Sequence, residues 1–135
     1  MLAFEALPKL IDEVRDGELK TALSEHLEET RYHVARVEQA FRAAGAEPTS
    51  ARSAALAGAL EQHNAQQVKE PTLRDYFHCA GAARTEHLEL GLYAAVLPLA
   101  SGEAVELLTR NRDDEEQALK RLTKLAERLR TELPG

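Results

Sequence analysis

The chain has 135 residues, the length of one domain, and a hydrophobic fraction of 44% that is large enough to build a core. Its formal net charge is −6 and its isoelectric point is about 5.4, which argues against a nucleic-acid binder with a basic surface. Aromatic residues make up only 4%, glycines are few and β-branched runs are absent. This composition predicts an all-α protein.

The sequence also predicts a soluble cytoplasmic protein with no membrane partner. Cys79 is the single cysteine and cannot form an intrachain disulfide, as suits a reducing compartment. The N-terminal residues lack the apolar segment of a signal peptide and include Glu5. The longest apolar stretch, residues 90–100, is too short to span a bilayer and contains Pro98.

The first two predicted helices are separated by a single breaker. The first runs from about Leu2 to Arg15 and ends at Asp16-Gly17. The second begins there and continues to about Ala44, before Gly45. The residues expected to face the core follow the alternating spacing of four and three that is typical of a bundle helix. They are Leu23, Leu27, Thr30, Val34, Val37, Phe41 and Ala44.

Three further helices follow. One is expected from Thr49 or Ser50 to about Gln66, and the next opens at Pro71-Thr72, with Asp75 completing a capping box. That helix ends before Pro98, and the last helix runs from Ser101-Gly102 to before Pro134. Their apolar stripes comprise Leu73, Phe77, Ala80, Ala83, Leu90, Tyr93 and Val96 in one, and Val105, Leu108, Leu119, Leu122 and Ala126 in the other. The short connections predict antiparallel neighbours in one helical bundle over residues 1–135.

Several carboxylates fall on or beside these apolar stripes. Glu86 lies in the middle of one stripe, Glu115 interrupts another, and Glu29 and His33 lie at the border of a third. His26 shares a helix face with this last pair. A buried unpaired carboxylate is costly, but carboxylates and a histidine that converge from three helices can share a cation. Such ligands suit iron, manganese or zinc.

Each of these residues also has a simpler interpretation. Glu29 and His33 are compatible with a solvated helix edge, which is common in Glu-rich helices. Glu86 can be satisfied by an arginine such as Arg84 or Arg112. Glu115 belongs to the run D-D-E-E, and a shift in helix register places it in water.

The remaining reactive residue types show no catalytic pattern. His63 and His78 have no ligand-like companions in the sequence and are interpreted as surface or packing residues. Cys79 lies on an apolar face and is interpreted as a small core residue. The sequence contains no Gly-rich phosphate loop, Cys-x-x-Cys or Gly-x-Ser-x-Gly motif.

Four segments resemble the YciF/YciE-like stress-response proteins, bacterial members of the ferritin-like superfamily. They are A-L-P-K-L (6–10), H-L-E-E-T-x-x-H-V-x-R-V-E-Q (26–39), T-E-H-L-E-L-G-L-Y (85–93) and, as the weakest, the leucine-rich start of the last helix. The resemblance covers nearly the whole chain, and the second segment is its most specific part. It implies a ferritin-like antiparallel four-helix bundle, with a small crossover helix, that is commonly dimeric and has a candidate di-iron centre.

The resemblance also implies a ligand set. Glu29 and His33 match the ligand pair of the second helix, Glu86 matches the block E-H-x-x-E, and Glu115 matches a glutamate of the final helix. The weaker candidates, which would support these ligands, are His26, His87 and Glu89.

Two departures from the family pattern reduce the expected metal content. A glutamate of the first helix would precede Met1, so that helix is shortened, and Leu119 stands where relatives have an acid. Glu5 cannot replace the lost glutamate, because it lies about 140° around the helix from that position. We therefore expect one weak iron site, or none, in each chain, with manganese or zinc as alternatives. Di-iron oxidation chemistry needs two irons with open positions, so we expect it to be impaired by such an incomplete ligand set, and the sequence leaves enzymatic activity undecided.

Two functions are compatible with the sequence. The first is a stress-response protein with a partly degenerate di-iron site, and the second is a metal-free helical scaffold for dimerisation or partner binding. A shortened first helix leaves apolar surface on the second and fourth helices, which predicts a homodimer. Neither function indicates a substrate.

Overall fold

The structure, a computed structural model, describes residues 2–46, 58, 61–64 and 66–134. The elements of this part of the chain are α1 (Leu2–Glu13), α2 (Gly17–Ala43), α4 (Pro71–Val96), the short 3-10 helix η1 (Leu97–Leu99) and α5 (Glu103–Thr131). No strand occurs within these residues, so the all-α prediction is confirmed. Most of the helix predicted between residues 49 and 66 lies outside the described residues.

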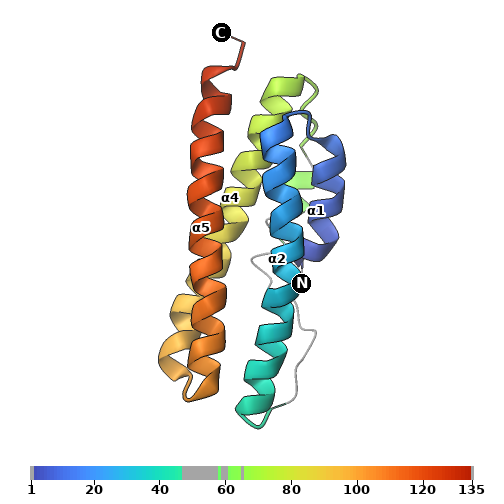
Figure 1. Ribbon diagram of the computed structural model, residues 1–135. Helices are drawn as coiled ribbons and strands as arrows, with labels where there is room; N and C mark the ends of the chain where they lie inside the picture. Colours follow the sequence, from blue (N-terminus) through green and yellow to red (C-terminus); the bar gives the residue numbers. More distant parts are fainter. Residues whose placement is uncertain (1, 47–57, 59–60, 65, 135) are drawn as a thin grey trace.

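The helices form a bundle in which α5 packs against both α2 and α4 (Figure 1). α5 runs antiparallel to these two partners, whereas α2 and α4 run in the same direction (Figure 1). The short α1 is antiparallel to α2 and lies along its N-terminal half only (Figure 1). None of the described helices combines the length and hydropathy needed to cross a membrane.

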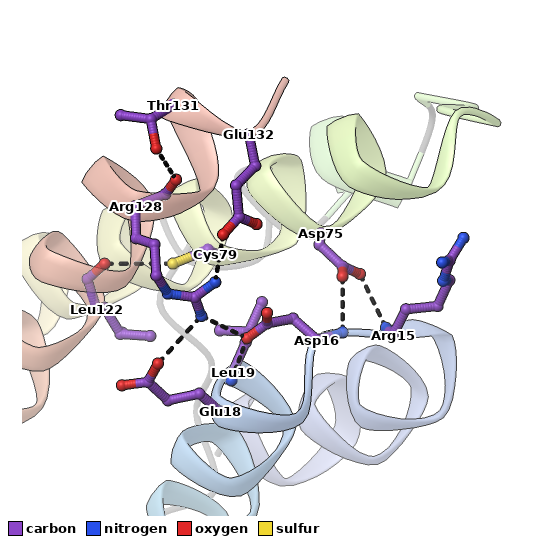
Figure 2. Close-up of polar contacts among 10 residues, drawn as sticks. All are labelled: Arg15, Asp16, Glu18, Leu19, Asp75, Cys79, Leu122, Arg128, Thr131 and Glu132. Carbon is purple, nitrogen blue, oxygen red and sulfur yellow. Dashed lines mark hydrogen bonds and ion pairs between the residues drawn. The ribbon is translucent and has the colours of Figure 1, made fainter. Parts of the chain in front are cut away.

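The turn between α1 and α2 is fixed by a side chain of α4. Asp75 is buried and accepts hydrogen bonds from the backbone N–H groups of Arg15 and Asp16, at 2.9 and 2.7 Å (Figure 2). The capping box predicted for Asp75 is therefore wrong. Because Pro71 is the first helical residue, Glu70 is the N-cap of α4 and accepts from the N–H groups two and three residues later.

An arginine joins the C-terminal end of α5 to the start of α2. Arg128 Nη2 lies 2.8 Å from Asp16 Oδ2 and 3.1 Å from Glu18 Oε2, and Nη1 lies 3.1 Å from Glu132 Oε1 (Figure 2). Asp16 is itself the N-cap of α2 and accepts from Leu19 N at 2.9 Å. The hydrogen bond from Arg128 outweighs burial and lowers the pKa of Asp16, so this contact is strongest when Asp16 is ionised.

The bundle interior contains two apolar clusters. The larger one joins α1 to the other helices and comprises Leu7, Leu10, Val14, Leu19, Ala22, Leu23, Cys79, Ala82, Leu122, Leu125 and Leu129. The smaller one lies near the other end of α2 and α5 and has Ala40, Ala104 and Leu108 at its centre. Buried polar residues occupy the interior between these clusters, and they are the basis of the candidate site.

Some members of the predicted apolar stripes are exposed. On α2 the side chain of Phe41 is 40% exposed, whereas His26 and His33 are buried in the bundle interior. Leu73, Val96 and Val105 are also exposed rather than buried. The periodicity located the helices correctly and placed Leu23, Leu108 and Leu122 on the buried side, but it also included exposed positions towards the helix ends, because polar residues hold core positions at the centre of the bundle.

Candidate metal centre

A layer of polar side chains fills the middle of the bundle between the two apolar clusters. α2, α4 and α5 all contribute to it, and none of its members is more than 7% exposed. The residues are His26, Thr30, His33, Glu86, Glu89, Asn111 and Glu115. Three buried carboxylates in so small a region would repel one another and lose hydration unless positive charge offsets them.

The first set of possible ligands, here named the inner group, consists of His26, Glu86 and Glu115. Each residue offers one ligand atom, and these atoms all lie within 4.8 Å of one another. His26 Nε2 lies 2.7 Å from Glu86 Oε1. Glu115 Oε1 lies 2.7 Å from His33 Nδ1, whereas Glu115 Oε2 and Glu86 Oε2 have no hydrogen-bond partner within the described residues. The inner group therefore contains acceptor atoms that a cation would satisfy.

The second set, here named the outer group, consists of Glu29, His33 and Asp114. Their ligand atoms also lie within 4.8 Å of one another. His33 Nε2 is 3.1 Å from Asp114 Oδ2 and 3.5 Å from Glu29 Oε1. The carboxylates of Glu29 and Asp114 are each 37% exposed, so this group lies closer to solvent than the inner group.

The pKa values around His33 reflect the negative charge of the cluster. Burial disfavours the charged imidazole, but Glu115, Asp114 and Glu29 together raise the pKa of His33 above its usual value. Burial and the neighbouring Asp114 raise the pKa of Glu29. Both shifts favour proton uptake at the cluster, so a metal ion that binds these ligands would compete with protons.

Further polar residues line the same layer. Asn111 donates from Nδ2 to the backbone carbonyl of His33 at 3.0 Å, which ties α5 to α2 beside the ligands. Burial raises the pKa of Glu89, and it raises the pKa of Tyr93 to about 12 despite a hydrogen bond with Asn111. Glu89 thus lies beside the predicted ligands, whereas His87 is exposed and belongs to neither group.

Comparison with known proteins identifies the family. A model described as a domain of unknown function, DUF892, matches residues 1–133. The chain belongs to the DUF892 family. The stress protein YciF of E. coli is a similar structure, with a TM-score of 0.89 and 26% identity over 98% of this chain and 87% of that one. YcfI of Rhodopseudomonas palustris, described as a candidate structural protein, has a TM-score of 0.85 and 28% identity over 90% and 82% of the two chains. No curated protein matches the sequence significantly.

In this YciF-like DUF892 chain the four predicted ligands do come together, but they divide between the two groups. Glu86 and Glu115 belong to the inner group, and Glu29 and His33 belong to the outer one. His26, predicted as a weaker candidate, is a full member of the inner group. Its spacing from His33, seven residues along α2, was the signal that placed both on one helix face.

Two of the simpler interpretations are wrong. Glu115 is 1% exposed, so the shift in register that would place it in water does not occur. Glu86 is paired with His26 rather than with an arginine, while Arg84 donates to Gln62 and Arg112 contacts Asp113. The arginine alternative failed because helix spacing does not show which face of a neighbouring helix an arginine occupies.

Asp114 is a candidate ligand that the sequence pattern did not indicate. It directly precedes Glu115 and therefore lies about 100° around the helix from the buried stripe. A ligand at the edge of a bundle falls outside an apolar stripe, so the stripe alone could not indicate it. The run D-D-E-E contained the residue but gave no reason to choose it.

His63 and His78 form a separate buried chain of polar contacts, so a surface position for them is wrong. His63 Nε2 lies 3.0 Å from His78 Nδ1, and His78 Nε2 lies 2.8 Å from Glu13 Oε2. The ring of His63 stacks on Phe77 with centroids 4.1 Å apart. The absence of a side chain at Gly81 allows this packing, because a Cβ there would approach the His63 ring to 2.4 Å. The packing interpretation holds, with polar partners that the sequence did not reveal.

Cys79 is buried in the larger apolar cluster, as predicted. Its Sγ donates to the backbone carbonyl of Leu122 at 3.2 Å (Figure 2). Burial raises the pKa of the thiol to about 11, so the thiolate is scarce at neutral pH. This supports its interpretation as a packing residue rather than a nucleophile.

Proposed function

We propose that this DUF892 protein binds one transition-metal ion in the inner group and serves in a stress response, by analogy with YciF, which is described as a stress protein. The observation that carries the proposal is Glu115, a carboxylate that is 1% exposed, whose Oε1 meets only the imidazole of His33 at 2.7 Å and whose Oε2 has no partner within the described residues. An unsatisfied buried carboxylate is costly, and a bound cation would offset that cost. Glu86 contributes a second such oxygen next to it.

The chemistry of the donors fits a first-row transition ion. One imidazole and two carboxylates suit iron, manganese or zinc, with iron favoured by the family resemblance. His26 and Glu86 come from different helices, and Glu115 from a third, so the ion would also hold the bundle together. Three protein ligands leave coordination positions for water, and a bound ion would supply Lewis-acid or redox chemistry there. The proposal concerns binding and assigns no reaction.

Elemental analysis tests the proposal directly. Purified protein is loaded with iron(II) or manganese(II), dialysed and analysed, together with Glu115→Gln and the exposed control Glu116→Gln. We expect about one ion per chain in the wild type and in the control, and none in Glu115→Gln, which keeps the size of the side chain but loses its charge. Equal metal content in all three proteins would show that Glu115 is not a ligand.

A second proposal is that the protein is a homodimer. Exposed apolar side chains are found where α2 and α4 end and α5 begins, at the opposite end of the bundle from the part that α1 covers (Figure 1). They include Phe41, Leu92, Val96, Leu99 and Val105. Leu99 alone is 86% exposed, which is costly for a monomer in water. This surface also supports the alternative function, in which the protein is a helical scaffold that works through dimerisation.

A further inference from the structure

The imidazole of His33 separates the inner group from the outer group. Its Nδ1 faces the inner side, 2.7 Å from Glu115 Oε1, and its Nε2 faces the outer side, 3.1 Å from Asp114 Oδ2. The two groups are therefore adjacent and share one ring as a common wall. An ion in either group would lie close to the charges of the other.

Only the outer group is contacted by a permanent positive charge within the described residues. Arg36 Nη1 lies 2.8 Å from Asp114 Oδ2, the same oxygen that meets His33. Arg36 Nη1 also donates to Asn111 Oδ1 at 3.2 Å, and Asn111 donates to the carbonyl of His33 at 3.0 Å. The side chain of Arg36 is only 17% exposed. Its contacts with Asp114 and Asn111 therefore hold the guanidinium in place. Burial by itself would raise the pKa of Asp114, but the hydrogen bonds and charges of Arg36 and His33 together outweigh it and lower that pKa.

The inner group has no such contact in the part of the chain that the structure describes. There the ion-pair partners of Glu86 and Glu115 are His26 and His33, and neither an arginine nor a lysine reaches them. Glu86 Oε2 and Glu115 Oε2 lack hydrogen bonds there, and on the outer side Glu29 Oε1 also lacks one, whereas Asp114 accepts from Arg36. The cluster is thus asymmetric in positive charge, because within the described residues a guanidinium contacts the outer group and none contacts the inner group.

We propose that Arg36 is a built-in counter-cation that closes the outer group to a second metal ion. The outer group offers the same kinds of ligand as the inner group, namely an imidazole and two carboxylates. It differs by the guanidinium on Asp114, which repels a cation and occupies the oxygen that the cation would need. The cluster therefore takes one ion at the inner group, and a second ion binds at Glu29, His33 and Asp114 only when Arg36 moves away. This inference rests on the proposed metal binding at the inner group.

Removing the guanidinium should open the outer group. We would load wild type, Arg36→Gln and the control Arg31→Gln with manganese(II) and measure the metal content after dialysis. Arg31 is on the same helix, is 61% exposed and forms an ion pair with Glu28, at 3.9 Å. We expect about one ion per chain in the wild type and the control, and about two in Arg36→Gln. The double variant Arg36→Gln/Asp114→Asn should return to one, because it lacks an outer ligand.

The outcomes separate this inference from the proposed function. One ion in both wild type and Arg36→Gln would overturn the role of Arg36 and leave the inner site intact, whereas no ion in any protein would overturn both. Calorimetric titration of the wild type with manganese(II) provides a check that needs no variant. A second ion that binds at least about tenfold more weakly than the first, or not at all, supports the inference. Two ions of equal affinity contradict it, even if Arg36→Gln fails to fold.

Discussion

At the scale of single residues, the polar layer of this protein is held by contacts between histidines and glutamates, whose strength depends on the charges of these side chains. Glu86 illustrates this, because one of its oxygens meets His26 at 2.7 Å and the other has no hydrogen bond within the described residues. Without an ion, this buried oxygen has lost its hydration and gained no hydrogen bond, which destabilises the folded state. Binding and stability should therefore be coupled through this side chain.

That coupling predicts the effect of Glu86→Gln on thermal unfolding. An ion at about 100 times its dissociation constant should stabilise the wild type by about 2.7 kcal/mol. For a chain of this size, such a gain raises the melting temperature by roughly 5–15 °C. Glu86→Gln keeps an oxygen for His26 but lacks the charge, so its melting temperature should not respond to manganese(II) or to a chelator. A variant that responds as the wild type does would remove Glu86 from the ligand set.

The chain of contacts from Glu13 through His78 to His63 predicts a different dependence on pH. Burial is the main cause that lowers the pKa of His63, from 6.5 to about 4, and it also lowers the pKa of His78. The negative charge of Glu13 opposes both shifts, whereas the charges of His78 and Arg84 lower the pKa of His63 further. Between the lowered and the ordinary pKa values, the two histidines therefore bind protons in the unfolded chain but not in the folded protein. Stability from this source is fully present above pH 6.5 and is lost as the pH falls towards 4.

Replacing His63 should therefore flatten the acid side of the stability profile. From pH 7 to pH 5 the shift of His63 corresponds to a loss of up to about 2 kcal/mol. His63→Gln should lose less stability than the wild type over this interval, and the exposed control His87→Gln should follow the wild type. The measurement is urea unfolding at pH 7 and pH 5. Equal losses in wild type and His63→Gln would show that His63 titrates freely in the fold.

At the scale of the helices, the ends of the elements depend on contacts that sequence spacing could not supply. Asp75 lies within α4, yet it accepts two backbone N–H groups from the turn between α1 and α2 (Figure 2). Spacing alone assigns such an acid to the nearest helix start. Its real partners are about 60 positions away along the chain, at the point where three helices meet.

Asp75→Asn should destabilise the protein, because the amide can accept a hydrogen bond through only one of its two terminal atoms. One partly buried backbone N–H is then left without its partner, which costs about 1 kcal/mol, the low end of the range for buried groups. The exposed residue Asp12 on α1 is the matched control, and Asp12→Asn should have an effect within about 0.5 kcal/mol. Denaturant unfolding of both variants measures the difference. Equal stability would mean that the turn does not depend on Asp75.

The helices themselves and most of the candidate site were predictable, because both depend on local spacing. Breakers such as Gly17 and Pro71 gave the helix starts correctly, and one helix face placed His26 and His33 together. The contacts between helices were not predictable. The pairing of Arg36 with Asp114 and of His63 with His78 joins residues from different segments, and single-chain periodicity carries no information on how helices rotate against one another.

At the scale of the whole molecule, the uneven cover of the bundle bears on its assembly. α1 contributes to the larger apolar cluster at one end, whereas Phe41, Leu99 and Val105 are exposed near the helix ends at the other (Figure 1). Leu92, Val96 and Leu99 follow one another at spacings of four and three, so they share one side of the C-terminal part of α4 and η1. A second copy of the chain that covers this side would bury apolar surface without altering the candidate metal centre.

The double variant Leu92→Glu/Val96→Glu tests the proposed homodimer. Charges on both protomers of a two-fold interface would face one another, and the lost apolar burial would add to their repulsion. We expect the wild type to have twice the mass of the chain in light scattering coupled to gel filtration, and the double variant to be monomeric with unchanged helicity. Leu73→Glu is the matched control, because Leu73 is comparably exposed, at 43%, but lies at the other end of α4 and should leave the dimer intact. A monomeric wild type would refute the dimer outright. A dimeric double variant would place the interface elsewhere on the molecule and leave the exposed side of α4 and η1 without a partner.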